Sequence, residues 1–169
     1  MVEDNEDDAA LLRLMFKRSR ILNPVQRVAS VQEATCYLKG EKEFSDRQAH
    51  PFPTLMIIDA QLRDGSGFDL LRWMQVHKPQ TPVGVVMLTG SDVHAFKLSY
   101  ELGAQSFLTK PLKFEDFQNL VRHVRGLKLT TTSDATCWNR NKTQGISFTR
   151  IASLEKRVLL RAILTPSAT

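Results

Sequence analysis

Short apolar runs alternate along this chain with longer stretches of helical spacing, and this alternation is the strongest constraint on the fold. Continuous apolar strands separated by helices are typical of a parallel β-sheet that is covered on both faces. We therefore predict a doubly wound α/β fold. The runs of strand length are residues 25–29, 55–58, 83–88 and 106–108.

The stretches between the runs carry apolar residues at intervals of three and four, as helices with one buried face do. Ser66 can cap one of these helices, Ser91 and Asp92 can open the next, and Gly103 can close it. The polar segment 39–53 contains a glycine and two prolines and predicts a long loop. The helical stretches are residues 11–15, 31–38, 68–74 and 114–127.

The first strand is unusually short in this sequence. Met1 and Val2 alone precede an acidic pair, whereas a buried strand usually has about 5–6 residues. A stunted strand and a chain that begins upstream both explain this. We favour the second, because half a central strand would leave ladder groups of its neighbours unpaired.

The basic charge of the chain belongs to its C-terminal part. The net charge is +5, of which residues 129–169 carry +4 and residues 1–128 only +1. We predict a compact domain over 1–128 and a linker and tail over 129–169, with one helix at 151–164. We expect no nucleic-acid partner and no membrane insertion. Two cysteines form no disulfide framework, so the expected compartment is the cytoplasm.

Polar side chains follow each apolar run at the point where the strand should end. Glu3 and Asp4 follow the short first strand at Met1-Val2, Asp59 follows the run 55–58, Thr89 follows the run 83–88, and Lys110 follows the last run after Thr109. The carboxyl ends of parallel strands meet at one edge of the sheet, where ligands bind in this fold class. These five side chains are therefore expected to converge.

Three carboxylates at one edge repel one another, and each is costly to remove from water. They predict a bound cation, and oxygen ligands without histidine or cysteine suit Mg²⁺. An ammonium and a hydroxyl beside the metal would suit a tetrahedral anion, and a carboxylate can act as a nucleophile towards phosphorus. The pattern thus predicts that Asp59 takes up a phosphoryl group with the help of Mg²⁺.

Six short motifs together resemble the receiver domain of two-component response regulators (the CheY-like domains), and the match spans roughly residues 1–128. The loop at 40–53 and the segment 100–104 are more specifically similar to the single-domain regulators paired with bacteriophytochrome-type histidine kinases. The resemblance implies a flavodoxin-like, five-stranded parallel sheet in the order 2-1-3-4-5. The motifs are Val2-Glu3-Asp4-Asn5, Ile58-Asp59, Asp64-Gly65-Ser66-Gly67, Leu88-Thr89-Gly90-Ser91, Gly103-Ala104 and Lys110-Pro111.

The resemblance also implies a role for each residue of the site. Asp59 corresponds to the phospho-acceptor, which receives its group from a sensor histidine kinase or a phosphotransfer protein. The metal ligands would be Glu3, Asp4, Asp59 and the backbone carbonyl of Gln61. Lys110 and Thr89 would contact the phosphoryl group, Thr89 and Phe107 would form the switch, and Gln61 and Ser91 would tune the phosphoryl lifetime. Self-association through the face of the fourth helix, fifth strand and fifth helix is a further expectation from the family.

Three positions depart from the family pattern, and one of them, Gly90, replaces a commoner alanine or serine and gives easier access to the phosphoryl site. Phe107 stands where tyrosine is common, so this ring has no hydroxyl to donate. Arg63 stands where a proline is usual, which makes the loop after Asp59 less rigid.

The predicted function is a stand-alone response regulator that is not an enzyme beyond its own phosphorylation and dephosphorylation. One alternative is a pseudo-receiver that no longer accepts phosphate and acts as an interaction scaffold. Another is a phosphatase-like enzyme with Asp59 as nucleophile. The second acid–base aspartate that such an enzyme needs two residues later is replaced by Gln61.

Overall fold

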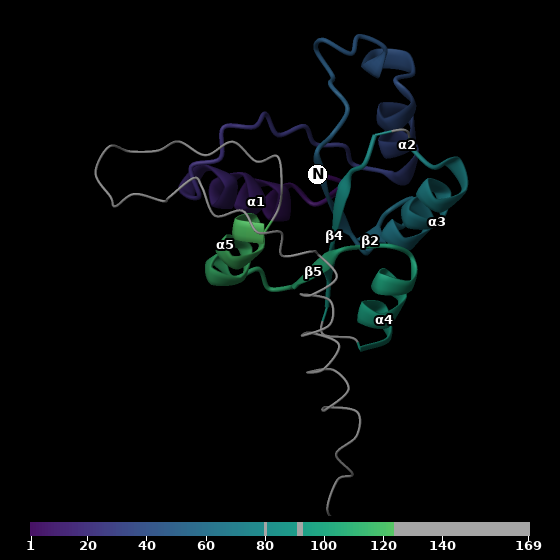
Figure 1. Ribbon diagram of the computed structural model, residues 1–169. Coiled ribbons are helices and arrows are strands. Elements are labelled where there is room, and N and C mark those ends of the chain that lie inside the picture. The colour runs from purple at the N-terminus through teal and green to yellow at the C-terminus, as the bar shows by residue number, and fades with distance from the viewer. Residues whose placement is uncertain (80, 91–92, 124–169) are drawn as a thin grey trace, which may run out of the picture. The chain divides into compact units, whose positions relative to one another are not determined.

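The computed structural model describes residues 1–79, 81–90 and 93–123 (Figure 1). The predicted tail, its helix at 151–164 and Ser91 lie outside these residues. None of the helices in these three ranges is long and apolar enough to cross a membrane. The helices are α1 (Glu6–Arg18), α2 (Val31–Lys39), α3 (Gly67–His77), α4 (Val93–Glu101) and α5 (Phe114–His123), with a 3₁₀ turn, η1, at Lys42–Phe44.

The centre of the fold is a parallel sheet of three strands in the order β1-β4-β5, which are β1 (Leu55–Asp59), β4 (Gly84–Thr89) and β5 (Ser106–Thr109). On the free side of β1, Val2 bridges in parallel to both Ile58 and Val28. The order across the sheet is therefore residue 28, residue 2, β1, β4 and β5. This is the predicted order 2-1-3-4-5.

The position of residue 28 differs from the prediction in length, whereas that of residue 2 is as short as expected. Each is reduced to a single bridging residue, whereas a strand was expected over residues 25–29. Within the described ranges, Val28 bridges to Val2 alone, through main-chain hydrogen bonds with Met1 and Glu3, the residues on either side of Val2. A strand needs a paired neighbour along its length, and Val28 has one only at this residue.

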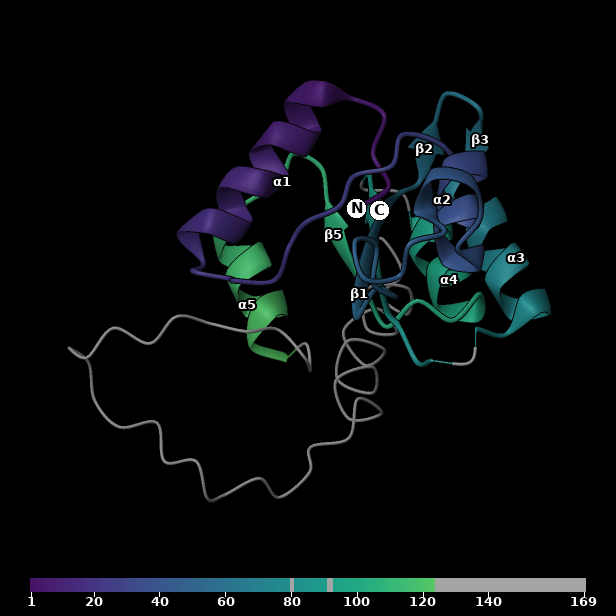
Figure 2. The same ribbon diagram turned by 90° about the horizontal axis from the view of Figure 1, so that it is seen from above.

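Helices cover both faces of the sheet, with α1 and α5 on one side and α2, α3 and α4 on the other (Figure 2). Alternate strand residues point into the two layers: Met56 and Ile58 pack with α2 and α3, and Ile57 packs with α1 and α5. The doubly wound class is confirmed. Each layer has its own apolar core, centred on Leu70, Leu71, Val85 and Met87 in one and on Leu12, Phe117, Val86 and Leu88 in the other.

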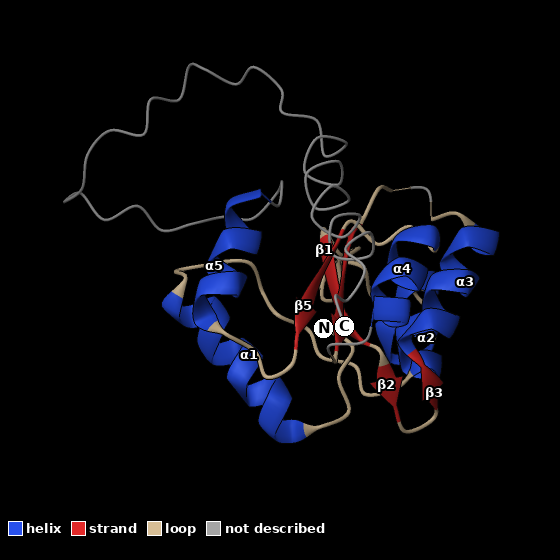
Figure 3. Ribbon diagram, turned by 90° about the horizontal axis from the view of Figure 1, so that it is seen from below, coloured by secondary structure: helices blue, strands red, loops and turns tan. Residues whose placement is uncertain are grey.

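A small antiparallel hairpin of β2 (Gln61–Leu62) and β3 (Gly65–Ser66) follows β1 and was not predicted. Figure 3 shows it next to α2 and α3. Its turn is fixed by Asp64, whose carboxylate accepts hydrogen bonds from the backbone nitrogens of Val31 and Gln32 at the start of α2, at 3.1 and 3.3 Å. The predicted cap at Ser66 is confirmed as a capping box with Asp69.

Candidate metal centre

The carboxyl end of β1 and the start of the chain bring three carboxylates together. Both main-chain polar groups of Val2 are hydrogen-bonded to β1. Its N–H donates to the carbonyl of Ile57 at 2.8 Å, and its carbonyl accepts from the backbone nitrogen of Asp59 at 2.9 Å. The acidic pair that follows Val2 therefore lies beside Asp59. One carboxylate oxygen from each of Glu3, Asp4 and Asp59 lies within 4.8 Å of the others.

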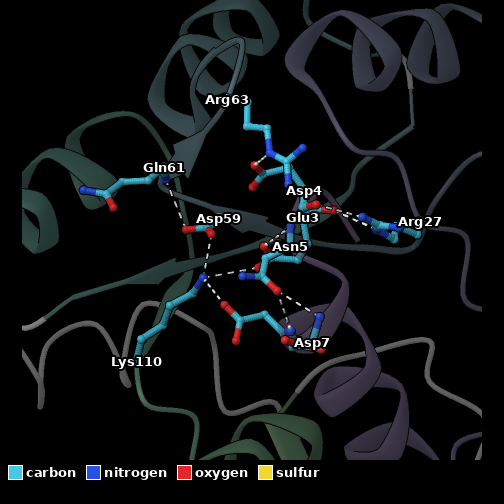
Figure 4. A network of polar contacts seen from close by, with 10 residues as sticks. Glu3, Asp4, Asn5, Asp7, Arg27, Asp59, Gln61, Arg63 and Lys110 are labelled. Atoms are coloured by element: carbon cyan, nitrogen blue, oxygen red, sulfur yellow. Dashed lines mark hydrogen bonds and ion pairs between the residues drawn. The ribbon is translucent and has the colours of Figure 1, made fainter.

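Lys110 supplies the positive charge of this cluster. Its Nζ donates to Asp59 Oδ2 at 2.6 Å, to Asp8 Oδ2 at 2.8 Å and to Glu3 Oε2 at 3.3 Å. Figure 4 shows the ammonium pointing from the end of β5 towards the acidic groups. The predicted convergence of Glu3, Asp4, Asp59 and Lys110 is therefore observed.

Two of the three carboxylates bonded to Lys110 are the most buried charges among the described residues. Glu3 is 0% exposed and Asp59 is 5% exposed. Burial raises the pKa of the Glu3 carboxyl, and the charge of Asp59 adds to this effect, while the N–H of Asn5 and the Lys110 ammonium oppose it. Burial alone would lower the pKa of Lys110, but its hydrogen bonds to Asp59 and Asp8 outweigh burial and raise that pKa. The lysine is therefore a permanent cation at neutral pH.

The donor set suits a hard divalent cation. Three oxygen ligands from separate side chains lie close enough to share one ion, and no histidine or cysteine is among them. Lys110 carries a single positive charge against the charges of Glu3, Asp8 and Asp59, so the centre retains an excess of negative charge. The residues present thus fit Mg²⁺.

Asp8 belongs to this cluster but was not predicted from the sequence, where only Glu3 and Asp4 of the acidic run were assigned to the site. It lies in the first turn of α1, which is capped by the side chain of Asn5. The available signal was its place in the acidic run that continues directly from Glu3 and Asp4 into the first turn of α1.

Arg27 is a second residue that the sequence reasoning missed. Its Nε donates to the carbonyl of Glu3 at 2.8 Å, its Nη2 donates to the carbonyl of Asp4 at 3.0 Å, and its Nη1 pairs with Glu6. The side chain is 16% exposed. Arg27 thus holds the main chain of the acidic pair from the side opposite β1, where the first strand is a single bridge.

Replacing Arg27 with methionine is expected to lower the free energy of unfolding by about 1.5–3 kcal/mol, because two partly buried carbonyls lose a charged donor. A lysine has one compact ammonium in place of two separate donor nitrogens and cannot reproduce the fixed fork geometry, so Arg27→Lys should restore less than half of the loss. Urea unfolding measures both variants. Arg72→Met is the matched control, since Arg72 forms an exposed pair with Asp69 on α3; an equal loss there would contradict the role of Arg27.

The remaining predicted residues lie around the cluster. The backbone nitrogen of Gln61 donates to Asp59 Oδ1 at 3.1 Å, while its exposed side chain extends away from Asp59 (Figure 4). Thr89 is buried at the end of β4, and its carbonyl accepts from the backbone nitrogen of Lys110 at 2.9 Å. The peptide bond between Lys110 and Pro111 is cis. Ser91 lies outside the described residues.

Phe107 lies away from the carboxylates, in β5 against α4. Its ring stacks on Phe96 with centroids 4.2 Å apart and planes at 17°, and it meets the edge of Tyr100 at 5.9 Å. The ring is partly buried. The predicted switch residue is therefore in contact with two aromatic side chains of α4.

Comparisons with known proteins agree with this arrangement. Residues 1–122 match the family model of the response regulator receiver domain. The chain is 31% identical over 140 residues to the response regulator protein PilR of Pseudomonas aeruginosa, covering 83% of this chain and 28% of PilR. It is 27% identical over 137 residues to the response regulator Rcp1 of Synechocystis, covering 79% of this chain and 89% of Rcp1. The solved bacteriophytochrome response regulator AtBRR superposes with a TM-score of 0.65 at 25% identity, covering 79% of this chain and 94% of that one.

Proposed function

Because this chain belongs to the response regulator receiver family, we propose that it accepts a phosphoryl group on Asp59 from a histidine kinase or a phosphotransfer protein, in a reaction that depends on Mg²⁺. The observation that carries the proposal is the position of Asp59. Its carboxylate is buried, one oxygen is 2.6 Å from the Lys110 ammonium, and the acidic pair lies on its other side.

Each side chain of the cluster has a proposed part in the transfer. Glu3, Asp4, Asp59 and the carbonyl of Gln61 would hold the metal ion, which would offset the negative charge that develops on the transferred group. Lys110 is placed to pair with the Asp59 carboxylate and then with phosphoryl oxygens. The N–H of Gln61 holds the other oxygen of Asp59, which fixes the orientation of the nucleophile.

We propose that the output is a change of conformation and of protein–protein contact, without turnover of an external substrate. Phosphorylation adds negative charge between β1 and β4. Thr89 at the end of β4 and Phe107 on β5 would pass this change to α4, whose Phe96 already stacks on Phe107. Gln61 and Ser91 would tune the phosphoryl lifetime, and the α4-β5-α5 face would serve self-association.

The proposed class of signalling system is that of the phytochrome regulators. Rcp1 and AtBRR match this chain over most of their own lengths, whereas PilR is covered over only 28% of its length. We therefore propose a cytoplasmic regulator that acts as a receiver domain, with a bacteriophytochrome-type kinase as the phosphoryl donor.

Incubation with acetyl phosphate and Mg²⁺ tests the proposal. The expected result is a mass increase of one phosphoryl group, labile to hydroxylamine, which peptide mapping places on Asp59. Excess chelator should prevent the labelling, and Asp59→Asn should reduce it to background. Absence of label from both acetyl phosphate and histidine kinases, in folded protein with Mg²⁺, would instead support a pseudo-receiver.

A further inference from the structure

Arg63 forms an ion pair with one of the carboxylates of the metal centre. It lies in the turn of the β2–β3 hairpin, and its Nε is 3.0 Å from Asp4 Oδ2. Figure 4 shows the guanidinium against the Asp4 carboxylate, on the side of the cluster away from Lys110. A proline, which is usual at this position in the family, could not form this contact.

Arg63 differs from the other cations of the site in how firmly it is held. Its side chain is 82% exposed, whereas those of Arg27 and Lys110 are 16% and 29% exposed. Arg27 donates to the main-chain carbonyls of Glu3 and Asp4 and not to their carboxylate oxygens. Arg63, in contrast, neutralises a carboxylate that a cation would need, and an exposed side chain can leave at little cost.

We propose that Arg63 is a built-in competitor of the divalent cation at Asp4, which lowers the affinity of the centre for Mg²⁺. This inference rests on the proposed function, because it concerns the same cation. The positive charge of Arg63 pairs with Asp4 when the centre holds no metal, and this ion pair must be released or weakened when Mg²⁺ binds. Removing the charge of Arg63 therefore tightens cation binding instead of weakening it.

Calorimetric titration with MgCl₂ tests the sign of this effect. Arg63→Gln should bind Mg²⁺ about two- to five-fold more tightly than the unchanged protein, the range expected for one exposed ion pair. Arg63→Lys keeps the charge and should stay within about two-fold of the unchanged protein. Arg72→Gln removes an exposed, paired arginine on α3 and controls for net charge.

Two further measurements separate direct competition from general electrostatics. In an Asp4→Asn background, Arg63→Gln should change the Mg²⁺ affinity by less than about 1.5-fold, because its partner is gone. In thermal unfolding, Arg63→Gln should show a larger rise in melting temperature on adding Mg²⁺ than the unchanged protein, since tighter binding to the folded state stabilises it more.

The failure of this inference can be told apart from the failure of the proposed function. Equal or weaker Mg²⁺ binding by Arg63→Gln, in a protein that binds Mg²⁺ and is labelled on Asp59, overturns the competition alone. An equal gain from Arg72→Gln also overturns it, because the effect would then follow net charge. Absence of saturable Mg²⁺ binding by the unchanged protein overturns the proposed metal dependence and the competition together.

Discussion

Replacing Gly67 with alanine is expected to lower the free energy of unfolding by about 3 kcal/mol, at the upper end of the usual cost of overpacking. A Cβ at this position would lie 2.1 Å from the backbone oxygen of Asp59 and 2.9 Å from Cγ2 of Ile58. The first of these atoms belongs to the main chain of the central sheet and cannot rotate away. The first turn of α3 would have to move off the end of β1.

The sign of this effect is opposite to that of helix propensity, which favours alanine over glycine by about 1 kcal/mol inside a helix. Gly90→Ala is the matched control: it also lies just beyond a strand end, and among the described residues, chain neighbours apart, no atom lies within 4 Å of a Cβ built there. Chemical denaturation should show that the control lowers the free energy of unfolding by less than about 0.5 kcal/mol. A loss at Gly67 as small as this would mean that the helix and the strand are not in close contact.

Replacing Lys110 with methionine is expected to lower the free energy of unfolding by about 2–4 kcal/mol, since removing one partner of a buried ion pair leaves the other charge uncompensated. Glu3 and Asp59 would face each other without an ammonium between them. Methionine has a similar length and keeps the packing of the stem. Labelling of Asp59 should fall strongly as well, because the charge that pairs with the phosphoryl oxygens is absent.

The loss in Lys110→Met should become smaller at acidic pH and on addition of Mg²⁺. Burial already raises the pKa of Glu3, and without Lys110 this carboxyl takes up a proton more readily, which removes the repulsion. Mg²⁺ removes it by binding. Lys97→Met is the control, since Lys97 forms an exposed pair with Glu101 at 3.8 Å, and it should cost less than about 0.5 kcal/mol. Equal losses in the two variants would contradict a structural role for Lys110.

The doubly wound class and the convergence at the sheet edge could be predicted because both depend on local signals repeated along the chain, whereas the strand order was implied by the resemblance to the receiver family. Each apolar run ends in a polar residue, so Asp59, Thr89 and Lys110 are placed by their own strands. The cap at Ser66 and the start of α3 depend on residues within four positions of each other. The parallel arrangement of the strands then places these residues at the same edge of the sheet.

Contacts between distant segments could not be predicted in the same way. Arg27 reaches carbonyl groups about 24 residues earlier in the chain, and main-chain acceptors leave no trace in the side-chain pattern. Asp64 was noted only as part of the motif Asp64-Gly65-Ser66-Gly67, but it caps α2, more than 30 residues away. The pair between Arg63 and Asp4 depends on a hairpin of two-residue strands, which is too short to show periodicity.

The carboxylates of the centre lie on backbone segments of unequal stability, because the described pairing on the free side of β1 is limited to Val2 and Val28. Asp59 lies on a strand with a continuous ladder to β4, whereas Glu3 and Asp4 follow a single bridging residue, Val2, and are held in addition by Arg27. Segments with few main-chain bonds open more often than the rest of a protein. A divalent cation bound by both Asp59 and the acidic pair would restrict the motion of the segment that carries Glu3 and Asp4 relative to β1. Metal availability would then set how many molecules have a fully assembled centre at any moment, before any donor arrives.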